Sequence, residues 1–200
     1  MKTPIEFYFD FSSPYSYLAS ELIEPLAARH DRGVEYRPTL LGAAFKVSGQ
    51  RALTEIPLKG DYSRRDFARC ARFYGIPLQI PEPFPVGTVT AARACLLLQR
   101  EHPTLAVPFI HRVFRAYFVD GRNISAAEVV HAVLAESGAD AAAVLEASGQ
   151  PGNKEALKAA VEVSIARGVF GAPFFFVDEE PFWGSDRLPQ VERWLATGAF

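Results

Sequence analysis

Residues 10–17 read DFSSPYSY, and they stand between a short apolar stretch and a helical pattern. The stretch before them, IEFYF at 5–9, is rich in aromatic and β-branched residues, which favours a buried strand. After them, apolar and polar residues recur at helical spacing, with Pro14 in the first turn, where its missing N–H costs nothing. This order predicts a strand that turns directly into a helix, whose start offers unpaired N–H groups and a positive dipole end.

The bulk composition suits one domain, or one domain that carries an insertion, with a small, soluble partner. The chain has 200 residues, 49% hydrophobic and 22% charged, enough to bury a core without metal ions or disulfides. A formal net charge of -2 argues against nucleic acid or an anionic membrane as partner. Cys70 and Cys95 stand far apart in helical patterns, so we expect neither a disulfide framework nor a metal site. An acidic residue precedes any run of signal-peptide length, and we expect a cytoplasmic protein.

Strand signals are confined to the two ends of the chain. Residues 33–38, GVEYRP, predict a second strand, and residues 174–177, FFFV, with 181–184, PFWG, predict two more before a terminal helix. Between about 62 and 167 these signals nearly vanish, and alanine-rich helical windows follow one another. This order of elements predicts an α/β, thioredoxin-like fold with an all-helical insertion.

The same contrast predicts the domain organisation. We expect residues 1–60 and 168–200 to form the thioredoxin-like domain and residues 61–167 to form a helical insertion domain. Within the insertion, Ser125 and Glu128 have the spacing of a capping box and predict a helix start.

Ser13 is the first candidate functional residue. Ser13-Pro14-Tyr15-Ser16 has the outline of a Cys-x-x-Cys redox motif with oxygen in place of both sulfurs. Serine is also a preferred helix N-cap, and capping alone would explain it here. No Gly-x-Ser-x-Gly elbow surrounds it, and none of the four histidines stands in a context that marks a partner base. A Ser-His-Asp hydrolase is therefore poorly supported.

Two turns near the C-terminus could complete a site at this helix start. Pro173 opens a predicted strand, and the pattern alone favours a trans Ala172–Pro173 bond. A cis bond would instead expose the Ala172 backbone for pairing with an extended peptide. Ser185 and Asp186 could cap the last helix, or they could hold the ammonium and carboxylate of a small peptide. Capping and binding can coexist.

Residues 45–62, FKVSGQRALTEIPLKGDY, are predicted as a loop. It is too long for a plain connector, and Gly and Pro residues interrupt it. Lys46 and Lys59 lie in it. Each is most simply a solvated charge, but in an active-site loop they could recognise carboxylates.

Taken together, FYFDFSSPYSYL, FKVSGQ, LKGDY, FYGIPL, VFGAPFFFV and FWGSDRL closely resemble the glutathione-dependent 2-hydroxychromene-2-carboxylate isomerases and their relatives, the kappa-class glutathione transferases. The resemblance runs along essentially the whole chain. It implies that Ser13 fills the redox-cysteine position and that glutathione brings the sulfur. By similarity Ser13 is the catalytic residue, its hydroxyl donating to that sulfur. A thiol of ordinary pKa about 8.5 is more readily ionised at a helix N-terminus beside such a donor.

The resemblance assigns glutathione contacts to further residues. Pro14 and Tyr15 stand beside Ser13 in the same motif. Ala172 would offer its backbone to the cysteinyl part of glutathione, beside a cis Pro173. Lys59 matches a position that assists glutathione binding in the transferases. The γ-glutamyl end would be held by the last motif, which comprises Trp183, Gly184, Ser185 and Asp186.

For the second substrate, the resemblance implies a small aromatic carboxylate. Lys46 would face its carboxylate, and Gln50 stands where relatives often carry Asn. The implied reaction is the interconversion of 2-hydroxychromene-2-carboxylate and trans-o-hydroxybenzylidenepyruvate, with glutathione regenerated and no metal required. The resemblance also implies a homodimer.

Three alternatives stay open. A kappa-like transferase would conjugate electrophiles and consume glutathione. A non-catalytic thiol-binding or peptide-binding module would bind without turnover. A dithiol oxidoreductase is less favoured, because Cys70 and Cys95 belong to separate predicted helices.

Overall fold

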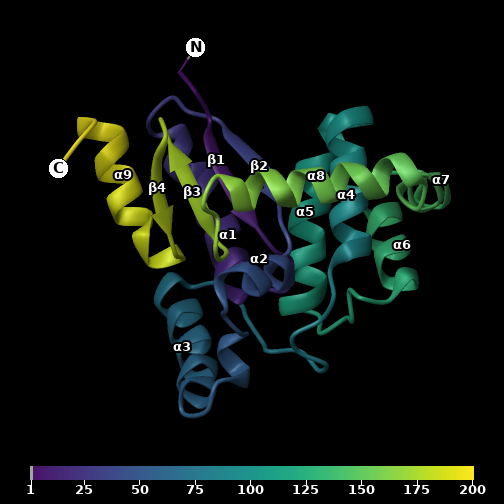
Figure 1. The fold of residues 1–200 in the computed structure, drawn as a ribbon, viewed down its shortest axis with the longest axis horizontal. Helices are drawn as coiled ribbons and strands as arrows, with labels where there is room; N and C mark the ends of the chain where they lie inside the picture. The colour runs from purple at the N-terminus through teal and green to yellow at the C-terminus, as the bar shows by residue number, and fades with distance from the viewer. Residues whose placement is uncertain (1) are drawn as a thin grey trace.

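The computed structural model describes residues 2–200, and within them four strands form one mixed sheet in the order β2-β1-β3-β4 (Figure 1). β1 (Ile5–Phe9) pairs in parallel with β2 (Val34–Pro38). On its other side β1 pairs antiparallel with β3 (Phe174–Val177), which continues antiparallel into β4 (Glu180–Trp183). The predicted strands are confirmed, and the sheet joins the two ends of the chain.

The region between about residues 62 and 167 is mainly helical, as the sequence predicted, and further helices lie on either side of it. They are α1 (Pro14–Ala28), α2 (Leu41–Ser48), α3 (Lys59–Tyr74), α4 (Val89–Glu101), α5 (Pro103–Phe118), α6 (Ala127–Glu136), α7 (Ala141–Ser148), α8 (Pro151–Ala166) and α9 (Leu188–Thr197), with single 3-10 turns η1 (Leu53–Glu55) and η2 (Ser185–Arg187). The prediction of a loop over residues 45–62 is wrong, because this segment contains the end of α2, η1 and the start of α3. None of the helices that the structure describes has the length and hydropathy to cross a bilayer.

Successive side chains of the strands point to opposite faces of the sheet, as strand geometry requires. Phe7, Phe9 and Phe175 belong to the main hydrophobic cluster, together with buried residues of α1, α5 and α9. Tyr8 and Phe176 belong to a second, smaller cluster. The rings of Phe7 and Phe175 stack across the β1–β3 pair with centroids 5.1 Å apart. Aromatic side chains bury large apolar areas, so they hold the middle of this sheet to its helices.

The inserted helices share the core of the sheet. Phe9 and Phe11 contact Phe114 of α5, with the Phe11 and Phe114 rings 5.1 Å apart. The main cluster extends from these rings through α4, α5, α6 and α7. One continuous core therefore couples the helical part of the chain to the strands.

The predicted capping box at Ser125 and Glu128 is wrong. α6 begins at Ala127, and Ala126 holds the cap position. Ser125 instead donates its hydroxyl to Asn123 Oδ1 at 2.6 Å, and its backbone N–H donates to the same oxygen. The competing side-chain turn around Asn123 displaces the expected cap.

The candidate site lies at one edge of the sheet. β1 ends and α1 begins there, and β3 starts and β4 ends at the same edge (Figure 1). α2 and α3 lie beside this edge in the same view. The topology thus gathers the motifs that the sequence placed far apart.

Candidate active site

Ser13 lies at the N-terminus of α1 with extended backbone angles, φ −93° and ψ 114°. Its Oγ accepts a hydrogen bond from the Ser16 backbone N–H at 3.1 Å, so the predicted cap is confirmed. The same hydroxyl donates to the Ala172 carbonyl at 2.9 Å, and Ser13 is only 4% exposed. The helix start and the turn before β3 are therefore joined through a single side chain.

Ala172 and Pro173 approach Ser13 from the start of β3. The peptide bond between them is cis, so the trans bond favoured by the sequence pattern is wrong and the cis bond implied by the family resemblance is confirmed. Pro173 is buried, and its carbonyl accepts from the Gly184 N–H at 3.0 Å. This hydrogen bond fixes the turn before β3 to the turn after β4.

Two glycines make close approaches possible in these turns. A Cβ at Gly171 would lie 2.4 Å from Nε1 of Trp183, so the absence of a side chain lets the indole lie against this turn. Gly184 has φ 110°, a conformation that favours glycine, and a Cβ there would lie 2.4 Å from Asp186 Oδ1. Ser185 is buried behind it.

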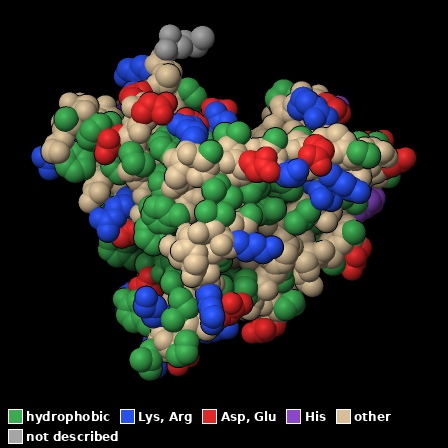
Figure 2. Space-filling view, in the orientation of Figure 1, with side chains coloured by type: hydrophobic (Ala, Val, Ile, Leu, Met, Phe, Trp, Pro, Cys, Tyr) green, Lys and Arg blue, Asp and Glu red, His purple; other side chains and the backbone are tan. Residues whose placement is uncertain are grey.

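The surface around these turns is partly apolar. Trp183 is 51% exposed and packs against Phe170, with ring centroids 4.8 Å apart. Hydrophobic side chains gather on the surface over this end of β3 and β4 (Figure 2). Asp186 is exposed and pairs with Arg187 at 3.3 Å. The site therefore offers a buried hydroxyl, a backbone turn, an aromatic surface and a solvated carboxylate.

A buried aspartate, Asp10, connects the starts of three helices. Its Oδ1 accepts from the Ser12 N–H at 2.8 Å and from the Thr88 hydroxyl at 3.0 Å, and its Oδ2 accepts from the Leu41 N–H at 2.8 Å. Burial raises the pKa of Asp10, and these hydrogen bonds oppose that rise. Leu41 begins α2, and Thr88 precedes α4. The sequence analysis missed this residue, although an acid directly after a buried strand was a usable signal, because burying a charge requires partners.

Tyr15 is the second residue of α1 and is half-buried. Its hydroxyl donates to Asp66 Oδ2 of α3 at 2.5 Å, and Asp66 also pairs with Arg69. The side chain of Tyr15 is thus directed to α3, and Asp66 is a second residue that the sequence analysis did not single out.

The remaining predicted residues are exposed on the helical side of the site. Lys46 lies on α2, Gln50 follows its C-cap Gly49, and Lys59 is the first residue of α3. Within residues 2–200 no hydrogen bond or ion pair joins the side chains of Lys46, Gln50 or Lys59 to Ser13. The structure places them on elements at the same edge of the sheet without a direct contact.

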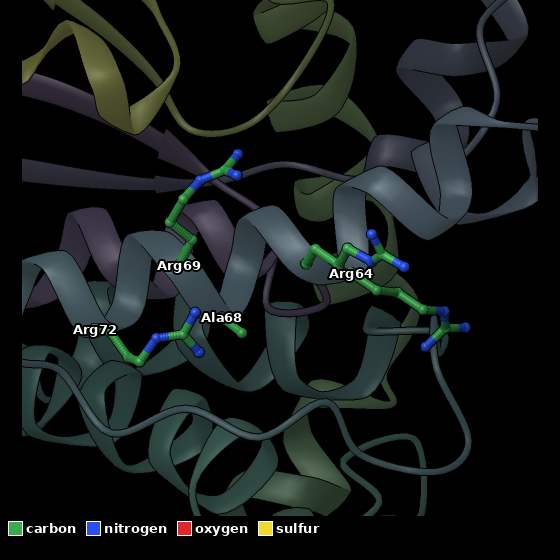
Figure 3. A pocket seen from close by; sticks show the side chains of 5 residues that line it. Arg64, Ala68, Arg69 and Arg72 are labelled. Atoms are coloured by element: carbon green, nitrogen blue, oxygen red, sulfur yellow. The ribbon is translucent and has the colours of Figure 1, made fainter.

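The outer side of α3 carries a separate group of arginines, and the hollow there is lined by Arg64, Arg65, Ala68, Arg69 and Arg72. The guanidinium groups of Arg64, Arg69 and Arg72 do not converge on one point (Figure 3). Arg69 is already paired with Asp66. This surface therefore lacks the geometry of a preformed anion site.

Two cysteines lie on separate helices of the described chain. Cys70 is half-buried on α3 and Cys95 is buried on α4, both as free thiols. Burial raises the pKa of each thiol. No group of three or more His, Cys, Asp or Glu side chains among residues 2–200 could hold a metal ion.

Comparison with known proteins agrees with this arrangement. The DSBA-like thioredoxin domain family matches residues 4–196 of the chain. A 2-hydroxychromene-2-carboxylate isomerase from Sphingobium xenophagum is 32% identical over 197 residues, which cover 98% of this chain and 99% of the relative. The chain belongs to the 2-hydroxychromene-2-carboxylate isomerase family of DSBA-like thioredoxin domains. The family and the fold predicted from the sequence are confirmed.

Two further known proteins are similar to this chain. A solved structure of a 2-hydroxychromene-2-carboxylate isomerase superposes with a TM-score of 0.86 at 28% identity, covering 96% of this chain and 94% of that chain. Glutathione S-transferase kappa 1 from Caenorhabditis elegans is 29% identical over 197 residues, 92% of this chain and 87% of the relative. The likeness to the isomerase structure and to this kappa-class transferase sequence therefore runs along nearly the whole length of the chain.

Proposed function

We propose that this protein is a glutathione-dependent isomerase that interconverts 2-hydroxychromene-2-carboxylate and trans-o-hydroxybenzylidenepyruvate in naphthalene-type aromatic catabolism. The observation that carries the proposal is the Ser13 hydroxyl, buried at the start of α1 and bonded to Ala172 before the cis Pro173. It stands in a chain 32% identical to an isomerase of that name. Because a hydroxyl occupies the place of a redox cysteine, the sulfur comes from the bound cofactor.

The residues at this edge fit a small peptide that carries a thiol. The Ser13 hydroxyl and the N-terminus of α1 suit a thiolate, because both favour negative charge. The turn at Ala172 lies next to them and can pair with extended peptide backbone. The exposed Asp186 carboxylate suits an ammonium group, and Ser185 lies beside it. Glutathione has all three features.

Bound glutathione would supply a thiol that adds to the substrate's double bond; the ring C–O bond of the chromene opens to a phenol and a ketone, the former double bond rotates as a single bond, and the thiol leaves again to restore the double bond in the trans form. Ser13 would turn its O–H from the Ala172 carbonyl to the sulfur and so stabilise the ionised thiol. Its Oγ would still accept from the Ser16 N–H, which keeps the oxygen in place. Lys46 on α2 would hold the substrate carboxylate, and Trp183 would help to hold the γ-glutamyl end of glutathione. These residues orient and stabilise, and Ser13 forms no covalent bond.

The deciding measurement is the ultraviolet absorbance of glutathione thiolate, titrated with pH in the presence of wild type and of Ser13→Ala. We expect a thiol pKa below its ordinary value with wild type and a return towards that value with the variant. Added 2-hydroxychromene-2-carboxylate should then change absorbance with wild type while the free thiol count stays constant. Glutathione that fails to bind, or that titrates alike with both proteins, would contradict the proposal and leave Ser13 as a helix cap.

A kappa-like glutathione transferase is the second candidate, favoured by the 29% identity to a kappa-class enzyme. The two differ in the fate of glutathione, because a transferase forms a stable conjugate and consumes the thiol. Counting free thiols after substrate turnover separates them. Binding without any turnover would point instead to a non-catalytic thiol-binding module.

As part of the same proposal, the protein works in the cytoplasm as a homodimer. Two free thiols suit a reducing compartment. Exposed apolar side chains on α2 and α3, which include Val47, Tyr62 and Phe73, supply surface that a second copy could cover. Light scattering of the purified protein would give the mass of about one or two chains of 22.0 kDa and decide the point.

A further inference from the structure

Resting on the proposed function, we propose that Tyr15 and Asp66 form a latch between α1 and α3 that positions Lys59 for glutathione. Tyr15 follows Ser13 and Pro14 in the motif, so a direct action of its hydroxyl on the sulfur would be the obvious role. The contacts of that hydroxyl point elsewhere.

The Tyr15 side chain contacts α3 through both its ring and its hydroxyl. Its ring packs edge-on against the buried Phe67, with centroids 4.9 Å apart. Its hydroxyl donates to Asp66 Oδ2 at 2.5 Å. Burial raises the pKa of Tyr15, and the neighbouring Asp66 carboxylate raises it further. The phenol therefore keeps its proton and uses that O–H to donate a hydrogen bond to Asp66, which leaves Ser13 as the donor to sulfur.

Asp66 is in turn held on its own helix. Its Oδ1 pairs with Arg69, and Cys70 Sγ donates to its Oδ2 at 3.6 Å. Arg69 also donates to the Tyr62 hydroxyl at 2.9 Å. The carboxylate thus has partners on both oxygens and cannot turn away from Tyr15 without losing them. A charged acceptor in such a network makes a stronger hydrogen bond than a neutral one.

The latch has a consequence for both ends of α3. Lys59 is the first residue of this helix and lies seven residues before Asp66, about 10 Å along the helix axis. Positions seven apart share one side of a helix, so Lys59 projects on the side that carries Asp66. Beyond Asp66, the helix ends at the half-buried Tyr74, and burial raises the pKa of that phenol. The latch thus fixes α3 to α1 between its two ends, Lys59 and Tyr74.

The test combines Tyr15→Phe with Lys59→Met in a double-mutant cycle of glutathione affinity, measured by calorimetry. We expect Tyr15→Phe to raise the Kd for glutathione about 3- to 10-fold, as loss of one charged hydrogen bond would. Lys59→Met should cost less in the Tyr15→Phe background than in wild type, because the lysine has already lost its position. The thiol pKa of bound glutathione should stay as in wild type.

Two further measurements distinguish the loss of the latch from a general structural defect. Tyr62→Phe removes a hydroxyl from the same network while leaving the Tyr15–Asp66 bond, and its glutathione Kd should match wild type. Amide hydrogen exchange, measured without glutathione, should become faster in α3 of Tyr15→Phe and stay unchanged in α9.

Three results would overturn the latch. Tyr15→Phe could raise the thiol pKa as Ser13→Ala does, which would make Tyr15 a donor to sulfur. Its effect could add simply to that of Lys59→Met, or α3 could exchange at the wild-type rate. If wild type itself binds no glutathione, the proposed function fails, while faster exchange in α3 would still report the latch.

Discussion

The two walls of the candidate site are built in opposite ways. The sheet wall, which consists of Ser13, Ala172, Pro173 and Ser185, is largely buried and tied together by hydrogen bonds such as those from Ser13 to Ala172 and from Gly184 to Pro173. The proposed helix wall, for which Lys46, Gln50 and Lys59 are the candidate residues, is exposed on α2, just after it and at the start of α3. Its side chains therefore take their positions from the docking of their helices.

Two aspartates provide that docking. Asp10 accepts from the first N–H of α2, and Asp66 receives the Tyr15 hydroxyl and so holds α3 to α1. The sheet wall would keep its shape through backbone pairing, whereas the helix wall depends on these carboxylates. The difference teaches that residues outside the recognised motifs can control the exposed half of a site.

The largest expected effect comes from Asp10→Ala. This change leaves the Ser12 and Leu41 N–H groups and the Thr88 hydroxyl without their acceptor inside the protein. We expect a loss of about 3–5 kcal/mol in the free energy of unfolding, measured with chemical denaturant. The matched control is Asp140→Ala, which removes an exposed cap from the Ala143 N–H and should cost about 1 kcal/mol. Equal losses in the two variants would show that Asp10 does no more than an ordinary helix cap.

Gly171→Ala tests the sheet wall. Its Cβ would meet the Trp183 ring at 2.4 Å, so the indole must move away from the turn and from Phe170. We expect a loss of about 1–3 kcal/mol in stability, a change in tryptophan fluorescence and weaker glutathione binding. Gly152→Ala, at an open position on α8, should leave all three unchanged or slightly raise stability. Unaltered fluorescence in Gly171→Ala would mean that the turn adjusts without moving Trp183.

Lys46→Gln tests the helix wall by removing one exposed charge. If Lys46 holds the substrate carboxylate, KM for the chromene should rise about 5-fold, the value of roughly 1 kcal/mol, while the Kd for glutathione stays constant. Lys158→Gln on α8 provides an exposed lysine far along the chain as control. A change in glutathione affinity with no change in KM for the chromene would contradict this proposal, because it would mean that Lys46 contacts glutathione instead of the substrate.

The smallest effect is the pH dependence of the Asp66 latch. Burial raises the pKa of Asp66, but hydrogen bonds from Tyr15 and Arg69 outweigh it, and the pKa lies below its ordinary value of 3.8. The folded protein thus holds this proton less tightly than the unfolded chain. Ionised Asp66 therefore stabilises the fold above about pH 4, and this contribution is lost as pH falls through the lowered pKa.

Denaturation of wild type and Asp66→Asn across this acid range measures the contribution. The difference in unfolding free energy between them should be largest near neutral pH and should shrink as pH falls. Tyr15→Phe, which removes one donor to the carboxylate, should shrink the difference at neutral pH as well. A difference that stays constant over the whole range would mean that the charge of Asp66 contributes nothing.

Much of this structure could be predicted from local patterns. The aromatic run at 5–9 and the stretch FFFV became β1 and β3, because their side chains can pack on both faces of a buried sheet. Ser13 became the cap of α1 because the proline after it suits a first helical turn. The prediction of a loop at 45–62 was wrong at its start, where α2 lies. The first N–H of α2, at Leu41, donates to Asp10, which lies more than thirty residues earlier in the chain and could not be recognised from the local pattern.

The sequence by itself determined the strands and the cap at Ser13, because strand periodicity, turn residues and the Ser-Pro motif act over a few neighbouring residues. The family followed from a resemblance of motifs along the whole chain. Only the tertiary structure decided the cis form of the Ala172–Pro173 bond and the partners of Asp10, Tyr15 and Asp66. A buried carboxylate finds its donors on segments that the chain brings together in space, and no local pattern records which segments those are.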